Sequence, residues 1–508
     1  MPPRTILPPL FLLATCLKIL LFPSYRSTDF DVHRNWLAIT RQLPISQWYF
    51  DDVNGGTVHT LDYPPAFAFF EYGLSNNPLT DWYLPEGDRC LELLPDSDNA
   101  SSGACVVFQR STVVLGDIFF WGGAYFACMA FHYGKPQQYS MAAFLLVVLN
   151  PALLWLDHIH FQYNGIMIGI FLASLGCLFM GNNVANQNSN PLAYDLYHLG
   201  GAALYAVLLN LKHLYLPLAP IYFCYLLQRY CLNARKQFLV DKFLLLALVT
   251  ASFLVLPWVP FVVAADDPKG QFLQILGRLF PFGRGLVHDY WAGNVWALFS
   301  LLDKVFRVVA GKILSMEGAH LPEPTPPVCA VLLLMSILPG LRVASTTKSN
   351  KKLVESIVYV SFCAFMLAYH VHEKAILTAL IPLTLLVEPG ADYHNVLFWN
   401  VCLFGLLGIL PLLFRPIELT LKLSSYVAYM GLASHLLQTP PEWMKKVQYA
   451  SVGMIGIVVL VLDILPIQGK WEFLPLMVTS VTCALGLIGC WGMMAWLLID
   501  SSRNEEKN

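Results

Sequence analysis

The sequence predicts an all-α protein that crosses the lipid bilayer many times. Of its 508 residues, 56% are hydrophobic and only 13% are charged, and the mean hydropathy is +0.56. The apolar residues are gathered in long windows, and a helix needs about 20 of them to cross a membrane. About fourteen windows reach a suitable length. These three observations exclude a soluble fold.

Charge does not indicate a macromolecular partner. The formal net charge is -2, and the 31 lysines and arginines are dispersed along the chain. A nucleic-acid surface or a polybasic lipid anchor would need them clustered. We therefore expect no nucleic acid and no obligate protein partner, and membrane lipid is the one environment that the composition requires.

The first span is expected over residues 6–22, with the N-terminus cytosolic because Arg4 precedes it. No small-residue cleavage site follows, so this segment is interpreted as a retained helix. Residues 24–110 then form a first long loop, which this orientation places in the lumen. The only sequon, at Asn99, agrees with that side, because a glycan is added only there.

The rest of the chain is assigned to further spans of one transmembrane domain over residues 1–508. Spans are expected at about 112–131, 141–155, 244–263 and 354–369, with the last ones within 394–499. A second lumenal loop is expected over residues 266–326. Its apolar part, 291–309, is interpreted as an interfacial or re-entrant element, because counting it as a span would place the lysines at 348–352 in the lumen.

Polar and ionisable residues gather at the lumenal ends of the spans. This set comprises Asp29, Asp31, His33, Arg34, Trp36, Asp62, Asp157, His158, His160, Gln162, Lys212, Arg278, Arg284, His370, His372 and Lys374. Each has an ordinary explanation alone: Asp29 can cap a helix, cations can anchor at the interface, and the histidines lack the carboxylate spacing of a metal site. Their convergence on one side favours a functional site.

A carboxylate and several cations at a membrane boundary suit sugar transfer from a lipid phosphate to a hydroxyl group. The carboxylate accepts the hydroxyl proton, and the cations stabilise the departing phosphate. No general acid is required, since phosphate leaves as an anion. A multispan transporter is the alternative from another class, but its pathway would need polar residues in mid-span, and the predicted helix centres are nearly free of charge.

Five motifs resemble the endoplasmic-reticulum glucosyltransferases that use dolichyl phosphate glucose. They begin at Ser27, Leu61, His158, Arg278 and His370, and read Ser-Thr-Asp-Phe-Asp-Val-His-Arg-Asn-Trp, Leu-Asp-Tyr-Pro-Pro, His-Ile-His-Phe-Gln-Tyr-Asn-Gly, Arg-Leu-Phe-Pro-Phe-Gly-Arg-Gly and His-Val-His-Glu-Lys-Ala-Ile-Leu. The resemblance implies the GT-C fold, a multi-pass protein of the endoplasmic-reticulum membrane, a lumenal active site, and an inverting mechanism without metal or other cofactor. The implied substrates are the dolichol-linked donor and a dolichol-pyrophosphate-linked oligosaccharide acceptor.

The resemblance also implies residue roles. Asp29 matches the family's catalytic base, and Asp31 stands where members often carry Glu. Supporting or acceptor-contact roles fall to Asp31, His33, Arg34, Trp36 and Asp62. Donor-phosphate contacts fall to Arg284, His370, His372, Lys374 and His160, while Asp157, His158, Gln162, Lys212 and Arg278 are expected near the site.

The family divides into enzymes that add the first or the second glucose to the N-glycan precursor. The segments at 32–35, 158–160, 212–215 and 370–372 resemble the second-glucose type. The first-glucose enzyme remains the alternative within the class. Separately, Cys90 and Cys105 share the first polar loop and can pair if it is lumenal, although two separate thiols are equally compatible with the sequence.

Overall fold

The computed structural model describes residues 4–50, 59–94, 101–186, 190–233, 235–288, 291–313, 318–390, 393–413, 415–437 and 473–505, with a few single residues between 442 and 453. The regular elements within these ranges are helices. The described residues form no β-strand beyond one isolated antiparallel bridge between Leu232 and Phe238. The all-α prediction is confirmed. The sequon at Asn99 lies outside the described residues.

Among the described residues, eight helices are long and apolar enough to cross a membrane. They are Gly103–Phe131, Gln137–Ile159, Asn164–Ala185, Pro191–Leu211, Val240–Val263, Pro326–Ala344, Tyr393–Leu412 and Leu474–Asp500. The multispan prediction is confirmed, but the expected count of about fourteen is not established. Part of the difference arises because some apolar helices are shorter than a full span. The first one, for example, has 14 residues. Part of the predicted C-terminal spans falls in 438–472, mostly outside the described residues.

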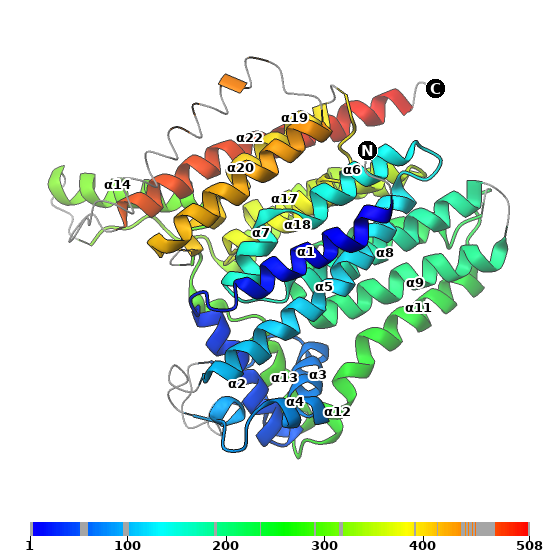
Figure 1. Cartoon of the computed structure of the whole chain (residues 1–508). Helices are drawn as coiled ribbons and strands as arrows, with labels where there is room; N and C mark the ends of the chain where they lie inside the picture. The colour runs from blue at the N-terminus through cyan, green and yellow to red at the C-terminus, as the bar shows by residue number, and fades with distance from the viewer. Residues whose placement is uncertain are drawn as a thin grey trace. The chain divides into compact units, whose positions relative to one another are not determined.

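The chain forms two compact units. The first contains residues 1–138, 150–216 and 230–281. Its long helices are α1 (Leu7–Leu20), α5 (Gly103–Phe131), α8 (Asn164–Asn186), α9 (Pro191–Leu211) and α11 (Val240–Val255). Figure 1 shows α5, α8, α9 and α11 as neighbours, and these pairs are in contact in that order. A Cβ atom on Gly123 of α5 would lie 2.0 Å from the carbonyl oxygen of Gly169 in α8, so glycine is required for this close approach.

Short helices of the same unit lie beyond the end of α5 (Figure 1). They are α2 (Thr28–Gln42), α3 (Pro65–Ser75), α4 (Pro78–Tyr83), α12 (Val259–Val263) and α13 (Pro268–Leu279). Side chains of Ser27, Asn77 and Asp267 cap α2, α4 and α13. The His33 and Trp36 rings of α2 pack edge-on or tilted against Phe67 of α3. This aromatic contact holds α2 against α3.

The second unit contains residues 139–149, 217–229 and 282–508. Its helices are α6 (Gln137–Val148, which begins two residues before the unit), α10 (Ala219–Arg229), α14 (Val295–Ile313), α15 (Pro326–Ser336), α16 (Leu338–Ala344), α17 (Asn350–Leu367), α18 (Leu377–Leu383), α19 (Tyr393–Ile409), α20 (Leu419–Leu436) and α22 (Leu474–Glu505). Helix α17 is buried over most of its length and packs against α16, α18 and α22. It is the central helix of this unit.

Several predicted boundaries are corrected. Helix α5 begins at Gly103 rather than near 112, because the Ser102 side chain caps it by accepting the amide of Cys105. The first loop therefore ends before residue 110. The span predicted at 141–155 extends over Gln137–Ile159 and ends in a short α7 (Pro151–Leu153) and a π-helical turn at Leu154–Ile159. Cys90 and Cys105 form a disulfide, which resolves the two alternatives for these thiols.

Candidate active site

Asp29 lies in the first turn of α2 but does not cap it. The cap is Ser27, whose hydroxyl accepts the amide hydrogen of Phe30 at 3.3 Å. The explanation of Asp29 as a helix cap is therefore wrong. The negative charge of Asp29 still interacts favourably with the helix dipole, because it lies near the N-terminus of α2.

The Asp29 carboxylate is held by the segment between the π-helical turn and α8. His160 Nε2 lies 3.3 Å from Asp29 Oδ2, and the Gln162 side-chain amide donates to the same oxygen. The other ring nitrogen of His160 lies 3.0 Å from the Tyr25 hydroxyl. The Asp29 side chain remains 28% exposed. It is thus oriented by fixed partners while part of its surface stays accessible to a substrate.

A buried arginine, Arg110, binds the backbone on which Asp29 and His160 are positioned. Arg110, which is 2% exposed, donates to the carbonyl oxygens of Tyr25 at 2.9 Å and Ile159 at 3.2 Å, and also to that of His158. One guanidinium group therefore connects the chain just before Asp29, at Tyr25, with the segment that leads to His160, at residues 158–159. Phe161 adopts a left-handed backbone conformation with φ of 80°, which is uncommon for a bulky residue and is typical of functional sites.

Hydrogen bonds connect Gln162 to a second group of predicted residues. Asn164 donates to Gln162 Oε1 at 2.9 Å and to Asp157 Oδ1 at 2.8 Å, and it accepts from Lys212 Nζ at 2.8 Å. The backbone amide of Gly165 donates to the other Asp157 oxygen at 2.6 Å. Three residues expected near the site, Asp157, Gln162 and Lys212, are thus joined in one network with Asp29.

Asp62 is close enough to influence the same surroundings. Burial raises the pKa of the Tyr63 phenol well above its usual value, and the charges of Asp29 and then Asp62 raise it further. Lys212 Nζ lies 5.4 Å from the centre of the Tyr63 ring. The phenol therefore stays protonated, and it can act as a hydrogen-bond donor beside two carboxylates.

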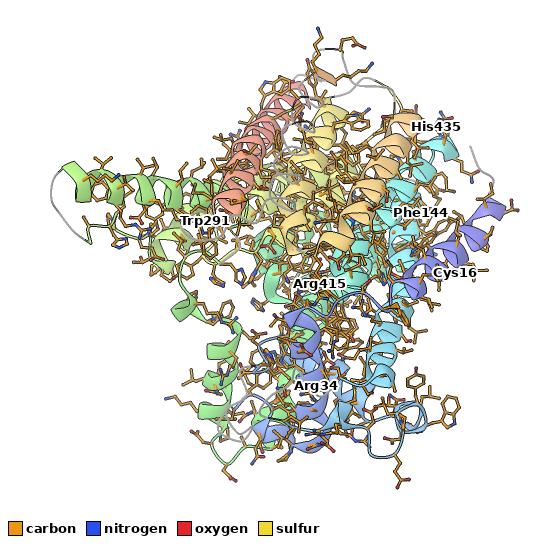
Figure 2. The ribbon with its side chains drawn as sticks, turned by 60° about the vertical axis from the view of Figure 1, so that its left-hand side comes forward. Cys16, Arg34, Phe144, Trp291, Arg415 and His435 are labelled. Atoms are coloured by element: carbon orange, nitrogen blue, oxygen red, sulfur yellow. A yellow bond between two sulfur atoms is a disulfide. The ribbon has the colours of Figure 1, made fainter. Side chains whose placement is uncertain are left out.

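Two other predicted residues of α2, Arg34 and Trp36, hold the loops that follow the helix. Arg34, labelled in Figure 2, is fully buried and donates to the carbonyl oxygens of Cys90 at 3.1 Å and Glu92 at 2.8 Å. Burial lowers its pKa, and the charge of Asp31 opposes that effect. Trp36 donates to the Thr60 carbonyl at 3.0 Å. These side chains of α2 are thus not solvated but hold the loops that follow.

Three further predicted residues, His33, Arg278 and His158, make structural contacts. His33 Nδ1 lies 2.7 Å from Glu71 Oε1, with both side chains buried. Arg278 donates to the Tyr49 carbonyl at 3.2 Å, and His158 Nε2 lies 3.5 Å from Asp117 Oδ1. These contacts place Arg278 and His158 in the framework of the first unit.

The predicted phosphate contacts other than His160 belong to the second unit. His370 has a left-handed backbone with φ of 55°, its amide donates to the Leu286 carbonyl at 3.1 Å, and its ring Nδ1 lies 2.9 Å from the Gly285 carbonyl. Gly285 also has a positive φ, of 88°, next to the half-turn that ends at Arg284. The structure therefore joins two motifs, around Arg284 and His370, that are separated in the sequence.

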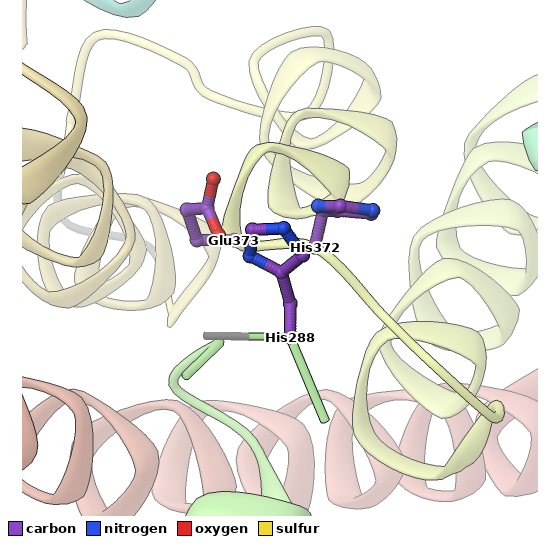
Figure 3. A group of neighbouring side chains, drawn as sticks. All are labelled: His288, His372 and Glu373. Atoms are coloured by element: carbon purple, nitrogen blue, oxygen red, sulfur yellow. The ribbon is translucent and has the colours of Figure 1, made fainter. Parts of the chain in front are cut away.

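His288 is a member of this cluster that the sequence did not indicate. Its ring centre lies 4.5 Å from that of His372 and 6.0 Å from that of His370. Figure 3 shows His288 and His372 together with Glu373; one ligand atom from each lies within 4.8 Å of the others. Such a group can hold a cation. The nearest signal in the sequence is its position four residues after Arg284 and three after the end of the motif that begins at Arg278.

Comparison with known proteins identifies the chain's relatives. The model of the ALG6, ALG8 glycosyltransferase family matches residues 14–494. The chain belongs to this family. It is accordingly a glycosyltransferase with the all-α, multispan GT-C fold. The transporter alternative is thereby excluded, and the resemblance found in the five motifs is confirmed.

Curated members of the ALG6, ALG8 family match nearly the whole chain. A Drosophila melanogaster protein named probable dolichyl pyrophosphate Glc1Man9GlcNAc2 alpha-1,3-glucosyltransferase is 36% identical, covering 94% of this chain and 92% of the relative. The Mus musculus protein named dolichyl pyrophosphate Glc1Man9GlcNAc2 alpha-1,3-glucosyltransferase is 34% identical with the same coverage. The Arabidopsis thaliana protein of that name is 34% identical over 95% of both chains.

Proposed function

We propose that this chain adds the second glucose to the lipid-linked precursor of N-glycans. The donor is dolichyl phosphate glucose, and the acceptor is the monoglucosylated oligosaccharide Glc1Man9GlcNAc2 on dolichyl pyrophosphate. The relatives' names support this acceptor. The observation that carries the proposal is the Asp29 carboxylate, held by His160 and Gln162 yet partly exposed, at the motif position of the family's base.

Asp29 acts as the general base. It takes the proton from the C3 hydroxyl of the acceptor's terminal glucose, and the oxygen forms a bond to the anomeric carbon of the donor. The bond between that carbon and the phosphate oxygen breaks, and its electron pair leaves with dolichyl phosphate. Attack from the face opposite the phosphate inverts the anomeric centre, so a β-linked donor gives the α-1,3 product.

The leaving phosphate is assigned to His370, His372 and Lys374, with Arg284 from the neighbouring motif. Cationic donors aimed at a departing phosphate stabilise the charge that develops on it. These side chains supply the charge that a metal ion supplies in other transferases. The proposed mechanism is therefore metal-independent. The active site faces the lumen of the endoplasmic reticulum, where the acceptor glycan is exposed.

The test is a transfer assay with purified protein and two acceptors. We expect glucose transfer to the acceptor that already carries one glucose, and little transfer to the acceptor without glucose. Product linkage is checked by α-1,3-specific glucosidase digestion. Preference for the unglucosylated acceptor would instead identify the first-glucose reaction.

A further inference from the structure

A polar pocket lies at the opposite end of α2 from Asp29. Its volume is about 380 Å³, within the range of roughly 300–1,000 Å³ that is typical of small-molecule sites. Arg41 and Gln42 of α2 contribute to its wall, together with Asp81, Glu86 and Glu92. Asp29 and Arg41 are separated by about 18 Å along the helix, at 1.5 Å per residue. All of these residues belong to the first unit.

The charges of the pocket determine which ligands suit it. Its lining holds one cation, Arg41, and four carboxylates, those of Asp81, Glu86, Asp88 and Glu92. This excess of negative charge repels phosphate and pyrophosphate. A shared metal ion is also disfavoured, because among the described residues the carboxylates of this pocket are not within 4.8 Å of one another as a set of three. A neutral ligand rich in hydroxyl donors fits the many acceptor oxygens.

The polar groups are held in place before any ligand arrives. Arg41 donates to the Ser75 carbonyl at 2.8 Å and to Asp81 Oδ1 at 2.7 Å. The Gln42 side-chain amide donates to the Leu91 carbonyl at 2.6 Å. The Cys90–Cys105 disulfide anchors the same loop. Fixed partners reduce the entropy that is lost when a ligand orders a side chain.

An exposed aromatic residue is found in the same short helix as Asp81, outside the set of residues that line the pocket. Trp82 follows Asp81 in α4 and is 83% exposed. A flat indole offers a surface for the C–H face of a sugar ring, because the face of an aromatic ring carries partial negative charge. The acceptor oxygens of the pocket, together with an exposed indole in the same helix, favour a saccharide as the ligand.

We infer that this pocket binds mannose residues of the acceptor oligosaccharide, at a distance from the glucose that reacts. The inference rests on the proposed function for the identity of the acceptor. A branched glycan whose terminal glucose lies at Asp29 has further hexoses that can reach the far end of α2. The pocket then contributes to acceptor affinity without touching the reacting atoms.

The first experiment measures binding without catalysis. Free high-mannose oligosaccharide is titrated into the purified full-length protein and followed by saturation-transfer NMR. We expect the D81A/E86A double variant to bind at least about tenfold more weakly than wild type, as loss of hydrogen bonds to charged groups implies. Asp266→Ala, which removes an exposed carboxylate of the same unit outside the pocket, is the matched control and should bind normally.

A second experiment compares two monoglucosylated acceptor lipids, one with the full oligosaccharide and one with only the glucosylated arm. The double variant should have a raised KM for the full acceptor, an unchanged kcat, and wild-type constants with the arm-only acceptor. Equal binding of free oligosaccharide by D81A/E86A and wild type would overturn the inference, as would equal changes in KM for both acceptors. If wild type transfers to neither acceptor but binds oligosaccharide through this pocket, the proposed function fails and the saccharide site stands.

Discussion

His160 Nε2 lies 3.3 Å from Oδ2 of Asp29, while its other ring nitrogen lies 3.0 Å from the Tyr25 hydroxyl. Motif position assigned His160 to the donor phosphate, and nothing in the sequence indicated contact with the base. An imidazole between a phenol and a carboxylate is well placed to orient that carboxylate. The contact therefore gives His160 a role in positioning Asp29.

Removing the charge of Asp29 should abolish transfer. Asp29→Asn keeps the size of the side chain but cannot accept a proton, so kcat should fall by about 10²–10⁴-fold, the usual contribution of a general base. Donor binding should be unchanged. Asp31→Asn is the matched control, and it should retain far more activity because the charge of Asp31 acts on the buried Arg34. Wild-type turnover by purified Asp29→Asn would remove Asp29 from the mechanism.

Loss of the Tyr25 hydroxyl should weaken the orientation of Asp29 through His160. Tyr25→Phe removes one hydrogen bond, so kcat should fall by roughly five- to tenfold, with KM for dolichyl phosphate glucose unchanged. A change confined to thermal stability, with kcat at the wild-type value, would show that Tyr25 is only structural.

Chelation tests whether the group of His288, His372 and Glu373 works without a metal. Because cationic side chains are assigned to the phosphate, activity should survive prolonged treatment with EDTA and removal of the chelate. Elemental analysis of the purified protein supplies a readout that is independent of activity. Loss of turnover that is restored by zinc or manganese would show that these three residues hold a catalytic ion.

The buried Glu71 should make stability depend on pH. Burial raises its pKa, although the His33 hydrogen bond opposes this. With a raised folded-state pKa, the contribution of Glu71 is fully present below its unfolded pKa of about 4.3 and is lost as the pH rises through the folded value. Glu71→Gln, which resembles the protonated form, should therefore gain Tm relative to wild type between pH 4.5 and 7.5, by about a few degrees.

The control for that experiment is Glu86→Gln, the same chemical change at an exposed position. Its Tm difference from wild type should stay constant over the same pH range. Thermal unfolding in detergent, followed by intrinsic fluorescence, measures both. Parallel curves for Glu71→Gln and wild type would contradict the assignment.

The Cys90–Cys105 disulfide should stabilise the part of the chain that anchors α2. Its cysteines are 15 residues apart, and closing a loop of that size contributes about 3 kcal/mol by the chain-entropy estimate. Replacing both with serine should lower Tm by several degrees and raise protease sensitivity around residue 90, where Arg34 binds the backbone. Cys128→Ser, a change at a buried free thiol of the same unit, controls for the loss of sulfur.

Much of the membrane architecture was predictable because hydropathy acts locally. The apolar windows at 244–263 and 354–369 correspond to helices within a few residues. Boundaries set by capping were less predictable, as at α5, where Ser102 begins the helix well before the first strongly apolar residue. The number of spans was harder to predict for a different reason, because short or broken apolar helices resemble full spans in their hydropathy.

The sequence by itself determined the class of protein, the family, and the position of Asp29, because composition and contiguous motifs are local properties of a chain. Only the tertiary structure decided what each polar residue contacts. It separated Arg34, which holds backbone carbonyls, from Gln162, which holds Asp29, and it added Tyr25 and His288. Hydrogen bonds join residues that are distant in sequence, so their partners follow from packing and not from spacing.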